Sequence, residues 1–297
     1  ERVADKGGRL TQVYELGQAA ADRLWRIPNG TECMLTPEHS IEIQNAIGAD
    51  IIMQLDDVVS STITGPRVEE AMYRTVRWLD RCLKAHKRPS EQSIFPIVQG
   101  GLDADLRKKC VEELLKREVN GYAVGGLSGG ESKDEFWKMV HVSTSLLPDG
   151  KPRYLMGVGV PEDLVVCSAL GIDMFDCVFP TRTARFGNAL VDEGSLCLKK
   201  SKYKTEMIPI SADCPCNTCK RYTRAYLNSI VTQETVGAHL LTEHNICYQM
   251  QLMKRIRTSI MEDKFPEFVR NFMKVRFANE DIPSWIFHAL AAVDIIL

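Results

Sequence analysis

Short apolar runs alternate with longer amphipathic stretches between about residues 50 and 180 of the chain. The apolar runs are Ala49 to Leu55, Ile94 to Val98, Tyr122 to Val124, Arg153 to Val158 and Met174 to Val178. The amphipathic stretches between them are Val68 to Lys87, Ala104 to Glu118, Lys133 to Leu147 and Glu162 to Leu170. Repeated strand-then-helix units are typical of a parallel sheet with crossover helices. We therefore expect five parallel strands in this part of the chain.

Polar residues and glycines directly follow most of these apolar runs. They are Asp56 and Asp57, Gln99 to Gly101, Gly125 to Leu127, and Gly157 to Gly159. In a (β/α)8 barrel such positions line the mouth at the carboxyl ends of the strands, where active sites are built. A doubly wound open sheet produces a similar pattern. The periodicity alone leaves both α/β folds open.

A different pattern begins after Pro180. It predicts a hairpin with strands at Asn188 to Val191 and Leu196 to Lys200, joined through Asp192 to Ser195. Helices are predicted at Arg221 to Leu241, Asn245 to Glu262, Phe265 to Phe277 and Pro283 to Ala292. No low-complexity linker separates this part from the rest of the sequence, so we interpret the cysteine-containing region within it as an insertion packed on the main domain.

The composition is that of a folded soluble chain, because 44% of its 297 residues are hydrophobic and 26% are charged. No run reaches the roughly 18 apolar residues of a membrane helix, and Glu1 to Gly8 is too charged to resemble a secretory signal. The sequence therefore favours a cytoplasmic protein. The net charge of −2 neither supports nor excludes a nucleic-acid partner, for which basic residues would have to gather locally.

Three cysteines stand together, whereas most of the others are isolated and are typical of reduced core thiols. Cys214, Cys216 and Cys219 lie within six residues, and His244 or His239 can supply a fourth ligand. Three cysteines and one histidine form the closed tetrahedral site that is typical of structural zinc. Such a site leaves no position for a catalytic water, so it predicts a stabilised subdomain and says nothing about chemistry.

Two acids accompany the last apolar run. Asp173 and Asp176 are three residues apart, so on an extended strand their side chains face opposite sides. Only one of them can point into a barrel mouth. From spacing alone, a solvated or capping aspartate is the alternative interpretation. A loop with Pro180, Arg182 and Arg185 is expected to follow the strand.

Six ordered motifs in the chain resemble those of the tRNA-guanine transglycosylase family, in its eukaryotic, queuine-type form. They are Gln54 to Val58, Val98 to Gly101, Gly121 to Leu127, Tyr154 to Gly159, Gly171 to Gly187 and the cysteine cluster. The resemblance runs from about Arg26 to the C-terminus. It implies an α/β fold of the (β/α)8 TIM-barrel type with an inserted zinc-binding subdomain at about residues 200–250.

The resemblance also implies the reaction. It is the exchange of guanine at the anticodon wobble position of tRNA for queuine, by a glycosyltransferase. Asp176 matches the family nucleophile, which would form a covalent bond to ribose C1′ before the new base enters. Two displacements at one carbon retain its configuration. Among the two histidines, the resemblance points to His244 as the fourth zinc ligand.

Four further residues match the family's base-binding positions. Asp56 matches the acid that contacts the amino and ring N–H edge of the base. Gln99 and the backbone of Gly126 match contacts to the carbonyl side, since together these groups supply the donors and acceptors that a guanine edge requires. Met156 matches a residue that packs on the base, although a methionine in the core of a strand would give the same pattern.

Basic residues after the nucleophile are expected to contact RNA. Arg182 and Arg185 resemble the family's anticodon-loop contacts, as a flipped-out nucleotide requires. The basic run Lys199, Lys200, Lys202 and Lys204 either contacts RNA or is a solvated surface. The turn from Leu127 to Glu131 resembles the eukaryotic form, in which small residues leave room for queuine. A glycine-rich turn that serves only backbone geometry is the alternative.

The resemblance implies assembly and location as well. The family's eukaryotic enzymes pair with a non-catalytic companion subunit to form a heterodimer. They are cytoplasmic, with peripheral association with the mitochondrial outer surface. Nothing in the composition tests these expectations.

The first 25 residues do not resemble the family's first strands. We do not find its early Thr-Asp-Ser-Gly-Gly-Phe-Gln motif, whose aspartate is the general acid/base. The nearest match is Ala4 to Gly8, in which Lys6 replaces the serine and Asp5 is a hypothetical remnant of the acid. We therefore expect an atypical segment at residues 1–25 and a transglycosylase barrel at 26–297 that lacks its first strands, as in a truncated or altered family member.

Three functional hypotheses follow. The leading one is an active queuine-type glycosyltransferase. The family's non-catalytic companion is disfavoured because Asp176 and the Pro180 to Arg182 sequence are intact. An RNA- or partner-binding protein that keeps the zinc site but lacks catalysis is the third hypothesis, because zinc-stapled subdomains also occur in RNA-binding proteins.

Overall fold

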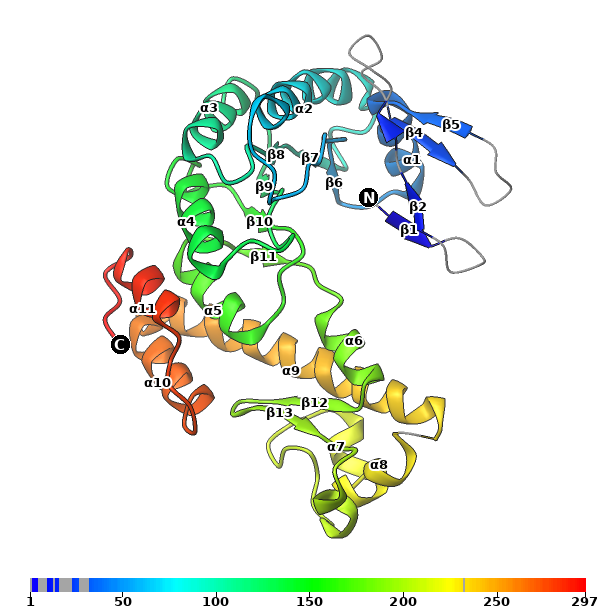
Figure 1. The fold of residues 1–297 in the computed structure, drawn as a ribbon, viewed down its shortest axis with the longest axis vertical. Helices are drawn as coiled ribbons and strands as arrows, with labels where there is room; N and C mark the ends of the chain where they lie inside the picture. Colours follow the sequence, from blue (N-terminus) through cyan, green and yellow to red (C-terminus); the bar gives the residue numbers. More distant parts are fainter. Residues whose placement is uncertain (1, 5–9, 13, 16–22, 27–31, 232) are drawn as a thin grey trace. The chain divides into compact units, whose positions relative to one another are not determined.

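The structure is a computed structural model that describes residues 2–4, 10–12, 14–15, 23–26, 32–231 and 233–297 (Figure 1). Its contacts divide the chain into two compact units. Unit 1 comprises Glu1–Met156 and Gly171–Met174, and unit 2 comprises Gly157–Leu170 and Phe175–Leu297. The chain passes between the units three times, so neighbours in sequence such as Met156 and Gly157 belong to different units.

The core of unit 1 is a series of parallel strands with helices between them. The strands are β6 (Ile51–Met53), β7 (Ser93–Phe95), β8 (Ile97–Val98), β9 (Tyr122–Val124), β10 (Arg153–Leu155) and β11 (Met174–Phe175), of which only Phe175 belongs to unit 2. β6 pairs with β7 in parallel, as do β8 with β9 and β9 with β10, and β11 follows β10 in the same sheet. The five predicted apolar runs therefore form strands in the described part of the chain, which confirms an α/β fold with parallel strands.

Gln54 bridges an interruption in this sheet. β7 and β8 are two halves of one predicted strand, separated at Pro96, which has no N–H to donate. The buried Gln54 Oε1 accepts from the Ile97 N–H at 3.1 Å, and its Nε2 donates to the Thr75 carbonyl at 2.9 Å. Since Thr75 lies in helix α2 (Pro66–Ala85), this one side chain ties β6 both to its neighbouring strand and to a helix.

Polar side chains cap three helices of unit 1, which are α1 (Pro37–Ile47), α3 (Ala104–Leu114) and α4 (Lys133–Thr144). By contrast, α2 begins after Gly65 without a side-chain cap. Asp103 accepts from the first backbone N–H groups of α3, and Ser132 forms a capping box with Glu135 at the start of α4. The predicted starts at Ala104 and Lys133 are thereby confirmed, while α1, which begins after the cap Thr36, was not predicted.

The N-terminal part contains short antiparallel strands where described. They are β1 (Arg2–Ala4), β2 (Leu10–Gln12), β3 (Tyr14–Glu15), β4 (Arg23–Arg26) and β5 (Glu32–Leu35). β1 pairs with β2, and β3, β4 and β5 form a second sheet. No parallel strand occurs among the described residues before Ile51. The expected boundary near residue 25 stays a prediction, and Asp5 lies outside the described residues.

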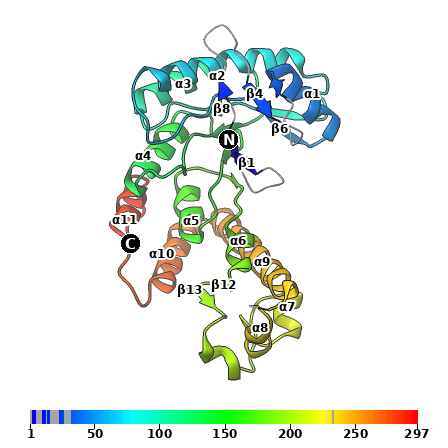
Figure 2. The same ribbon diagram turned by 45° about the vertical axis from the view of Figure 1, so that its right-hand side comes forward.

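Unit 2 is mainly helical and holds one hairpin. Its elements are α5 (Pro161–Ala169), α6 (Phe179–Arg185), β12 (Asn188–Val191), β13 (Gly194–Cys197), η1 (Ser201–Thr205), α7 (Asn217–Arg221), α8 (Arg224–Ile230), α9 (Thr235–Met261), α10 (Phe265–Arg276) and α11 (Ser284–Ala291). The long α9 lies beside α6 and also contacts α5, α8 and α10 (Figures 1 and 2). The predicted hairpin is confirmed, with a shorter turn because Val191 pairs with Gly194.

The segment from Phe179 to Arg185 was expected to be a loop, and this prediction is wrong because it forms α6. Pro180 stands in the first turn of the helix, where its missing N–H costs no helical hydrogen bond. The Thr183 hydroxyl donates to the Phe179 carbonyl at 2.7 Å within the helix. A proline followed by two arginines is therefore compatible with a helix start.

The predicted helix break between Leu241 and Asn245 is also wrong. α9 continues through it, because Leu241, His244, Tyr248 and Leu252 follow the helical period and are all buried. The polar residues His244 and Asn245, beside which the break was predicted, also lie on the buried face. The helical structure is interrupted instead between Ile230, where α8 ends, and Thr235, where α9 begins. The described helices, α9 included, contain no apolar stretch of the kind that spans a bilayer.

Candidate active site and metal centre

A cluster of three cysteines and one histidine lies in unit 2. The ligand atoms of Cys214, Cys216, Cys219 and His244 all lie within 4.8 Å of one another. His244 Nδ1 is 3.6, 3.7 and 3.3 Å from the three Sγ atoms, in that order. Cys214 is half-buried and the other three residues are buried. These residues could hold a metal ion, whereas the alternative ligand His239 is exposed and outside the cluster.

Local hydrogen bonds dock the cysteine turn on α9. Cys216 caps α7, and its Sγ accepts from the Cys219 N–H at 3.2 Å. Between them, the Thr218 hydroxyl donates to the Leu240 carbonyl of α9 at 2.8 Å. The turn is thereby held against the helix one turn before His244, which brings sulfur and imidazole together.

The protonation of His244 suits metal binding. Its Nε2 lies 2.8 Å from the Leu190 carbonyl oxygen, which can only accept, so Nε2 carries the proton and donates it. Nδ1 then directs its lone pair toward the sulfur atoms. Burial lowers the pKa of His244, which keeps the ring neutral, and burial raises the pKa of Cys216. A divalent cation would supply the positive charge that buried thiolates require, so the donor set fits zinc.

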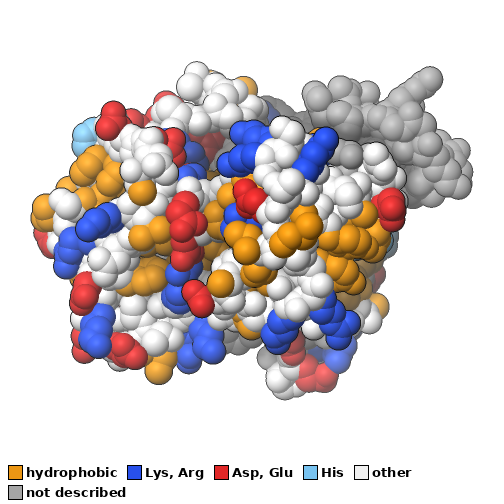
Figure 3. Space-filling view, turned by 90° about the horizontal axis from the view of Figure 1, so that it is seen from below, with side chains coloured by type: hydrophobic (Ala, Val, Ile, Leu, Met, Phe, Trp, Pro, Cys, Tyr) orange, Lys and Arg blue, Asp and Glu red, His pale blue; other side chains and the backbone are white. Residues whose placement is uncertain are grey.

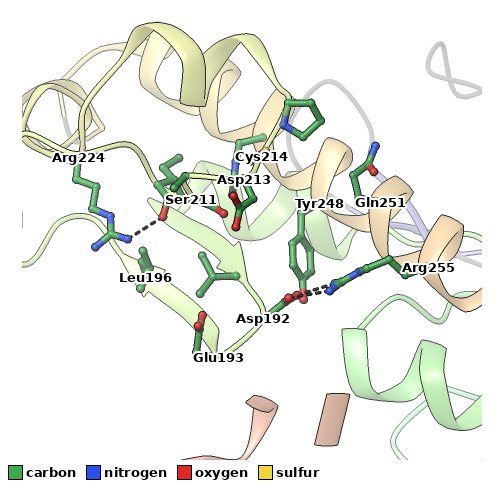
Figure 4. Close-up of a pocket in the computed structure, with 15 residues that line it drawn as sticks. Asp192, Glu193, Leu196, Ser211, Asp213, Cys214, Arg224, Tyr248, Gln251 and Arg255 are labelled. Atoms are coloured by element: carbon green, nitrogen blue, oxygen red, sulfur yellow. Dashed lines mark hydrogen bonds and ion pairs between the residues drawn. The ribbon is translucent and has the colours of Figure 1, made fainter. Parts of the chain in front are cut away.

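A cavity of about 480 Å³ adjoins the cluster, and Cys214 and His244 form part of its wall (Figure 4). Arg255 in this wall donates to the Asp192 carboxylate at 2.8 and 2.6 Å, and Tyr248 lies next to the pair. Asp192 and Arg255 in this wall are thus paired with each other. Cys214 is the ligand least shielded by protein, so reagents in solvent reach the cluster from its side.

Four of the expected base-binding residues come together in unit 1. Gln99, which is only 2% exposed, donates from Nε2 to Asp56 Oδ2 at 2.7 Å. A Cβ built on Gly126 would lie 2.4 Å from Gln99 Oε1. A Cβ on Gly125 would lie 3.1 Å from Gln99 Nε2 and 3.5 Å from the Met156 Sδ. The absence of side chains on the two glycines thus leaves room for the Gln99 amide, and the Met156 sulfur lies beside Gly125.

The two neighbouring aspartates after β6 have different surroundings. Asp57 is fully buried and binds two guanidinium groups of α2, with Arg67 at 2.9 Å and Arg74 at 2.5 Å. Its N–H donates to the Thr75 hydroxyl at 3.0 Å. Asp57 thus fastens the strand end to the helix, while Asp56 faces Gln99. The sequence analysis missed this anchor, although Arg67 and Arg74 are seven residues apart and so share one helical face.

Asp176 follows β11 directly and is exposed within unit 2. Its Oδ1 accepts from the Gly157 N–H at 2.8 Å, in the glycine turn after β10. Asp173 has a structural partner instead, because its Oδ2 accepts from the Arg153 N–H at 2.8 Å and its own N–H donates back to Arg153. Because Asp173 already pairs with the backbone of Arg153, Asp176 is the better candidate for the reactive carboxylate.

The expected RNA-binding arginines lie on α6. Arg182 and Arg185 are both exposed and three residues apart, so they project from adjacent positions on one side of the helix. The buried Asn245 holds α6 in place, since its Nδ2 donates to the carbonyls of Pro180 and Asn188 at 2.9 and 3.0 Å.

The basic run after the hairpin is exposed around η1, at Lys199, Lys200, Lys202 and Lys204. Figure 3 shows one face of the molecule, on which Lys and Arg side chains are interspersed with acidic and apolar ones. Among the described side chains on that face, the basic ones form no continuous surface. An RNA-binding role for these lysines stays a prediction.

Comparisons with known proteins identify the family. The profile described as Queuine tRNA-ribosyltransferase matches residues 4–278, so the match begins earlier than the start near Arg26 that we expected. The chain is 55% identical over 307 aligned positions to the Queuine tRNA-ribosyltransferase catalytic subunit of Schizosaccharomyces pombe, covering 99% of this chain and 76% of that protein. The protein of the same name from Caenorhabditis elegans is 55% identical, over 83% of this chain and 62% of its own length.

A bacterial relative gives the same result. The Queuine tRNA-ribosyltransferase of Thermus thermophilus is 45% identical over 96% of this chain and 73% of its own length. The chain therefore spans between 62% and 76% of the length of these three relatives. The expected α/β fold of the TIM-barrel type is that of the matched family, and the parallel strands and the Cys3His cluster agree with it. On profile, identity and coverage, this chain is a member of the queuine tRNA-ribosyltransferase family.

Proposed function

We propose that this chain exchanges guanine for queuine at the anticodon wobble position of tRNA, as a tRNA-guanine transglycosylase. The observation that carries the proposal is the buried Gln99 bonded to Asp56, with Gly126 and Met156 at the same place. Membership of the family and the names of its relatives support the same reaction. A pocket that reads a purine edge is what base exchange needs before any bond is broken.

The pocket residues complement guanine chemically. An ionised Asp56 only accepts hydrogen bonds, so it suits the amino and ring N–H groups of guanine. The amide of Gln99 and the N–H of Gly126 can donate to the carbonyl side. Met156 offers a polarisable thioether to a ring face. We propose these four contacts as the recognition of the base.

We propose Asp176 as the nucleophile. One carboxylate oxygen would bond to ribose C1′ while the C1′–N9 bond breaks and its electron pair leaves with guanine, which takes up a proton. Queuine would then lose a proton, attack C1′ and release the carboxylate, so configuration is retained. The Gly157 N–H bonded to Oδ1 holds the carboxylate in one orientation.

Two further elements support selection of substrate. Arg182 and Arg185 on α6 offer guanidinium groups to anticodon phosphates and bases. In the turn after β9, the Glu131 carboxylate accepts from the N–H groups of Ser128 and Gly129. We propose that this small-residue turn leaves the space that the cyclopentenediol of queuine occupies.

Zinc is proposed as the resident metal, held by Cys214, Cys216, Cys219 and His244. It would supply structural cross-linking of the cysteine turn to α9, without a role in the chemical steps. Assembly with a non-catalytic companion subunit and a cytoplasmic location, including the mitochondrial outer surface, belong to the same proposal. They rest on the family resemblance alone.

Labelled guanine incorporation tests the proposed function. The protein, alone and with a family companion subunit, should incorporate label into a tRNA whose anticodon begins with guanine. A tRNA that differs only by adenine at that position should take up none. If zinc-loaded, folded protein incorporates no label in either preparation, the enzyme proposal fails, and a protein that only binds RNA or its partner is left.

Substitution Gly126→Ala should selectively weaken base binding. Gly126 has φ +69°, and the added methyl would lie 2.4 Å from Gln99 Oε1, so Gln99 would be displaced from Asp56. We expect the KM for guanine to rise by roughly tenfold or more, the equivalent of about 1.4 kcal/mol. Steady-state exchange kinetics at saturating tRNA measure this.

Gly130→Ala is the matched control for that variant. Gly130 lies in the same turn region with φ +115°, but a Cβ there would meet no atom within 4 Å. It therefore carries backbone strain without filling the pocket. Equal KM increases in the two variants would show that strain in the turn, and not the pocket beside Gln99, determines base binding.

A further inference from the structure

A buried arginine connects the two glycine loops that border the proposed base pocket. Arg107 of α3 is fully buried. Its Nε donates to the Gly101 carbonyl at 2.8 Å, and its Nη2 donates to the Gly125 carbonyl at 3.0 Å. Its Nη1 lies 3.4 Å from the Ser143 hydroxyl of α4. One side chain thus spans the loop after β8, the loop after β9 and two helices.

The bond to Gly125 determines how the next amide points. A peptide unit is planar and trans, so its C=O and N–H point in opposite directions. The Gly125 carbonyl and the Gly126 N–H belong to one peptide unit. Because Arg107 holds the carbonyl on its own side, the Gly126 N–H is directed away from Arg107. Gln99 lies against this same pair of glycines.

The charge of Arg107 has no ionised hydrogen-bond partner, since its partners are two carbonyl oxygens and one hydroxyl. Burial lowers its pKa to about 10, which still leaves it protonated at neutral pH. A cation that polarises the Gly125 carbonyl makes the Gly126 N–H of the same peptide unit a stronger donor. Such a donor binds a negatively charged oxygen more strongly than it binds a neutral carbonyl oxygen.

We infer that Arg107 is a positioning residue for base exchange, which fixes the Gly125–Gly126 peptide unit so that the Gly126 N–H binds the carbonyl side of the base. The inference rests on the proposed function. When the C1′–N9 bond breaks, its electron pair stays with the base, and negative charge spreads to the carbonyl oxygen. A preorganised, polarised N–H at that oxygen favours the departing base over the bound nucleotide.

Two substitutions separate the geometry from the charge. Arg107→Met removes both, and we expect kcat to fall roughly a hundredfold and the KM for guanine to rise roughly tenfold. Arg107→Lys keeps a cation but cannot bond both carbonyls in the planar fork of a guanidinium. We expect it to recover much of kcat while the KM stays raised. A residue that acts only through stability would not split the two constants.

Arg153→Lys is the matched control. Arg153 is also buried, and its guanidinium donates to backbone carbonyls, those of Leu147 and Gly171, at 2.6 and 3.3 Å. It lies at the start of β10, whereas the proposed pocket follows the strand ends. This variant should lose about as much thermal stability as Arg107→Lys and retain the wild-type kcat and KM for guanine.

Hydrogen–deuterium exchange supplies a readout that does not depend on activity. Loss of Arg107 should speed amide exchange in the peptide that covers Gly125 to Glu131, and Arg153→Lys should not. If the amide exchange of this peptide is unchanged in Arg107→Met, the inference is overturned, whether or not the wild-type chain is active. If the wild type is active and the kinetic constants of Arg107→Met lie within twofold of its values, the inference is also overturned. If the wild type shows no base exchange but the amide exchange changes as expected, only the proposed function is contradicted.

Discussion

Asp176→Ala should reduce base exchange by roughly four orders of magnitude or more, because removal of a covalent nucleophile typically costs that much in kcat. Alanine has no oxygen to bond to ribose C1′, and the hydrogen bond from the Gly157 N–H is lost with it. Asp176 is exposed, so the substitution should change stability little. The affinity for tRNA, measured by fluorescence anisotropy, should stay within about threefold, since most RNA contacts are made by other groups.

The covalent intermediate gives a direct test of the same residue. Incubation of wild-type protein with guanine-containing tRNA should yield an RNA–protein adduct that survives denaturing electrophoresis, and Asp176→Ala should yield none. Asp173→Ala is the control, because Asp173 lies three residues earlier but pairs with the backbone of Arg153. An adduct that forms with Asp176→Ala and disappears with Asp173→Ala would exchange the roles assigned to the two acids.

The strand–helix series could be predicted from the sequence because burial determines it locally. Parallel strands covered on both sides read as continuous apolar runs, such as Tyr122 to Val124, all of which are buried. Helix starts were equally local, since Asp103 and Ser132 cap the helices that follow them. Whether a segment forms a strand or a helix could thus be predicted from residues that are close to each other in sequence.

The errors in the sequence analysis arise where a distant partner decides the structure. Asn245 was predicted as the first residue of a new helix, but it lies inside α9, is buried and binds the carbonyl groups of Pro180 and Asn188, over 50 residues away in sequence. The same bonds help to hold α6, which had been expected as a loop. Pattern analysis counts such residues as polar and exposed, because only the tertiary contact satisfies them.

The candidate site also has parts that the sequence predicted and parts that only the structure revealed. The metal cluster was visible from spacing, because three of its ligands lie within six residues, and His244 was chosen over His239 from the resemblance; the structure places His244 in the cluster. Asp56, Gln99, Gly126 and Met156 were named from the resemblance, and the structure brings them together in unit 1. Asp57 and Arg107 hold the segments next to these residues through ion pairs and hydrogen bonds. Their polar partners come from elements that no local sequence pattern connects.

Loss of one metal ligand should unfold the cysteine turn. We expect Cys216→Ser to lower the zinc content from about one per chain to a small fraction, and Tm by roughly 10 °C or more, because structural zinc binding is worth about 10–16 kcal/mol in small domains. Serine is a strong N-cap, so the cap that Cys216 provides for α7 would be retained. The loss of stability would therefore report the metal. Elemental analysis and differential scanning calorimetry measure the two quantities.

Cys247→Ser is the matched control. Cys247 is a half-buried thiol on α9, the helix that carries His244, and it packs against the same apolar core as Cys216 but is not one of the clustered ligands. It should retain a full complement of zinc and shift Tm by about 3 °C or less, as a modest change in packing does. Proteolysis should then cut Cys216→Ser between Lys199 and Arg224 and leave Cys247→Ser intact there. Should Cys216→Ser keep its zinc and resist cleavage, the cluster would not be a metal centre, and the buried thiols with the neutral His244 would stabilise the turn by packing alone.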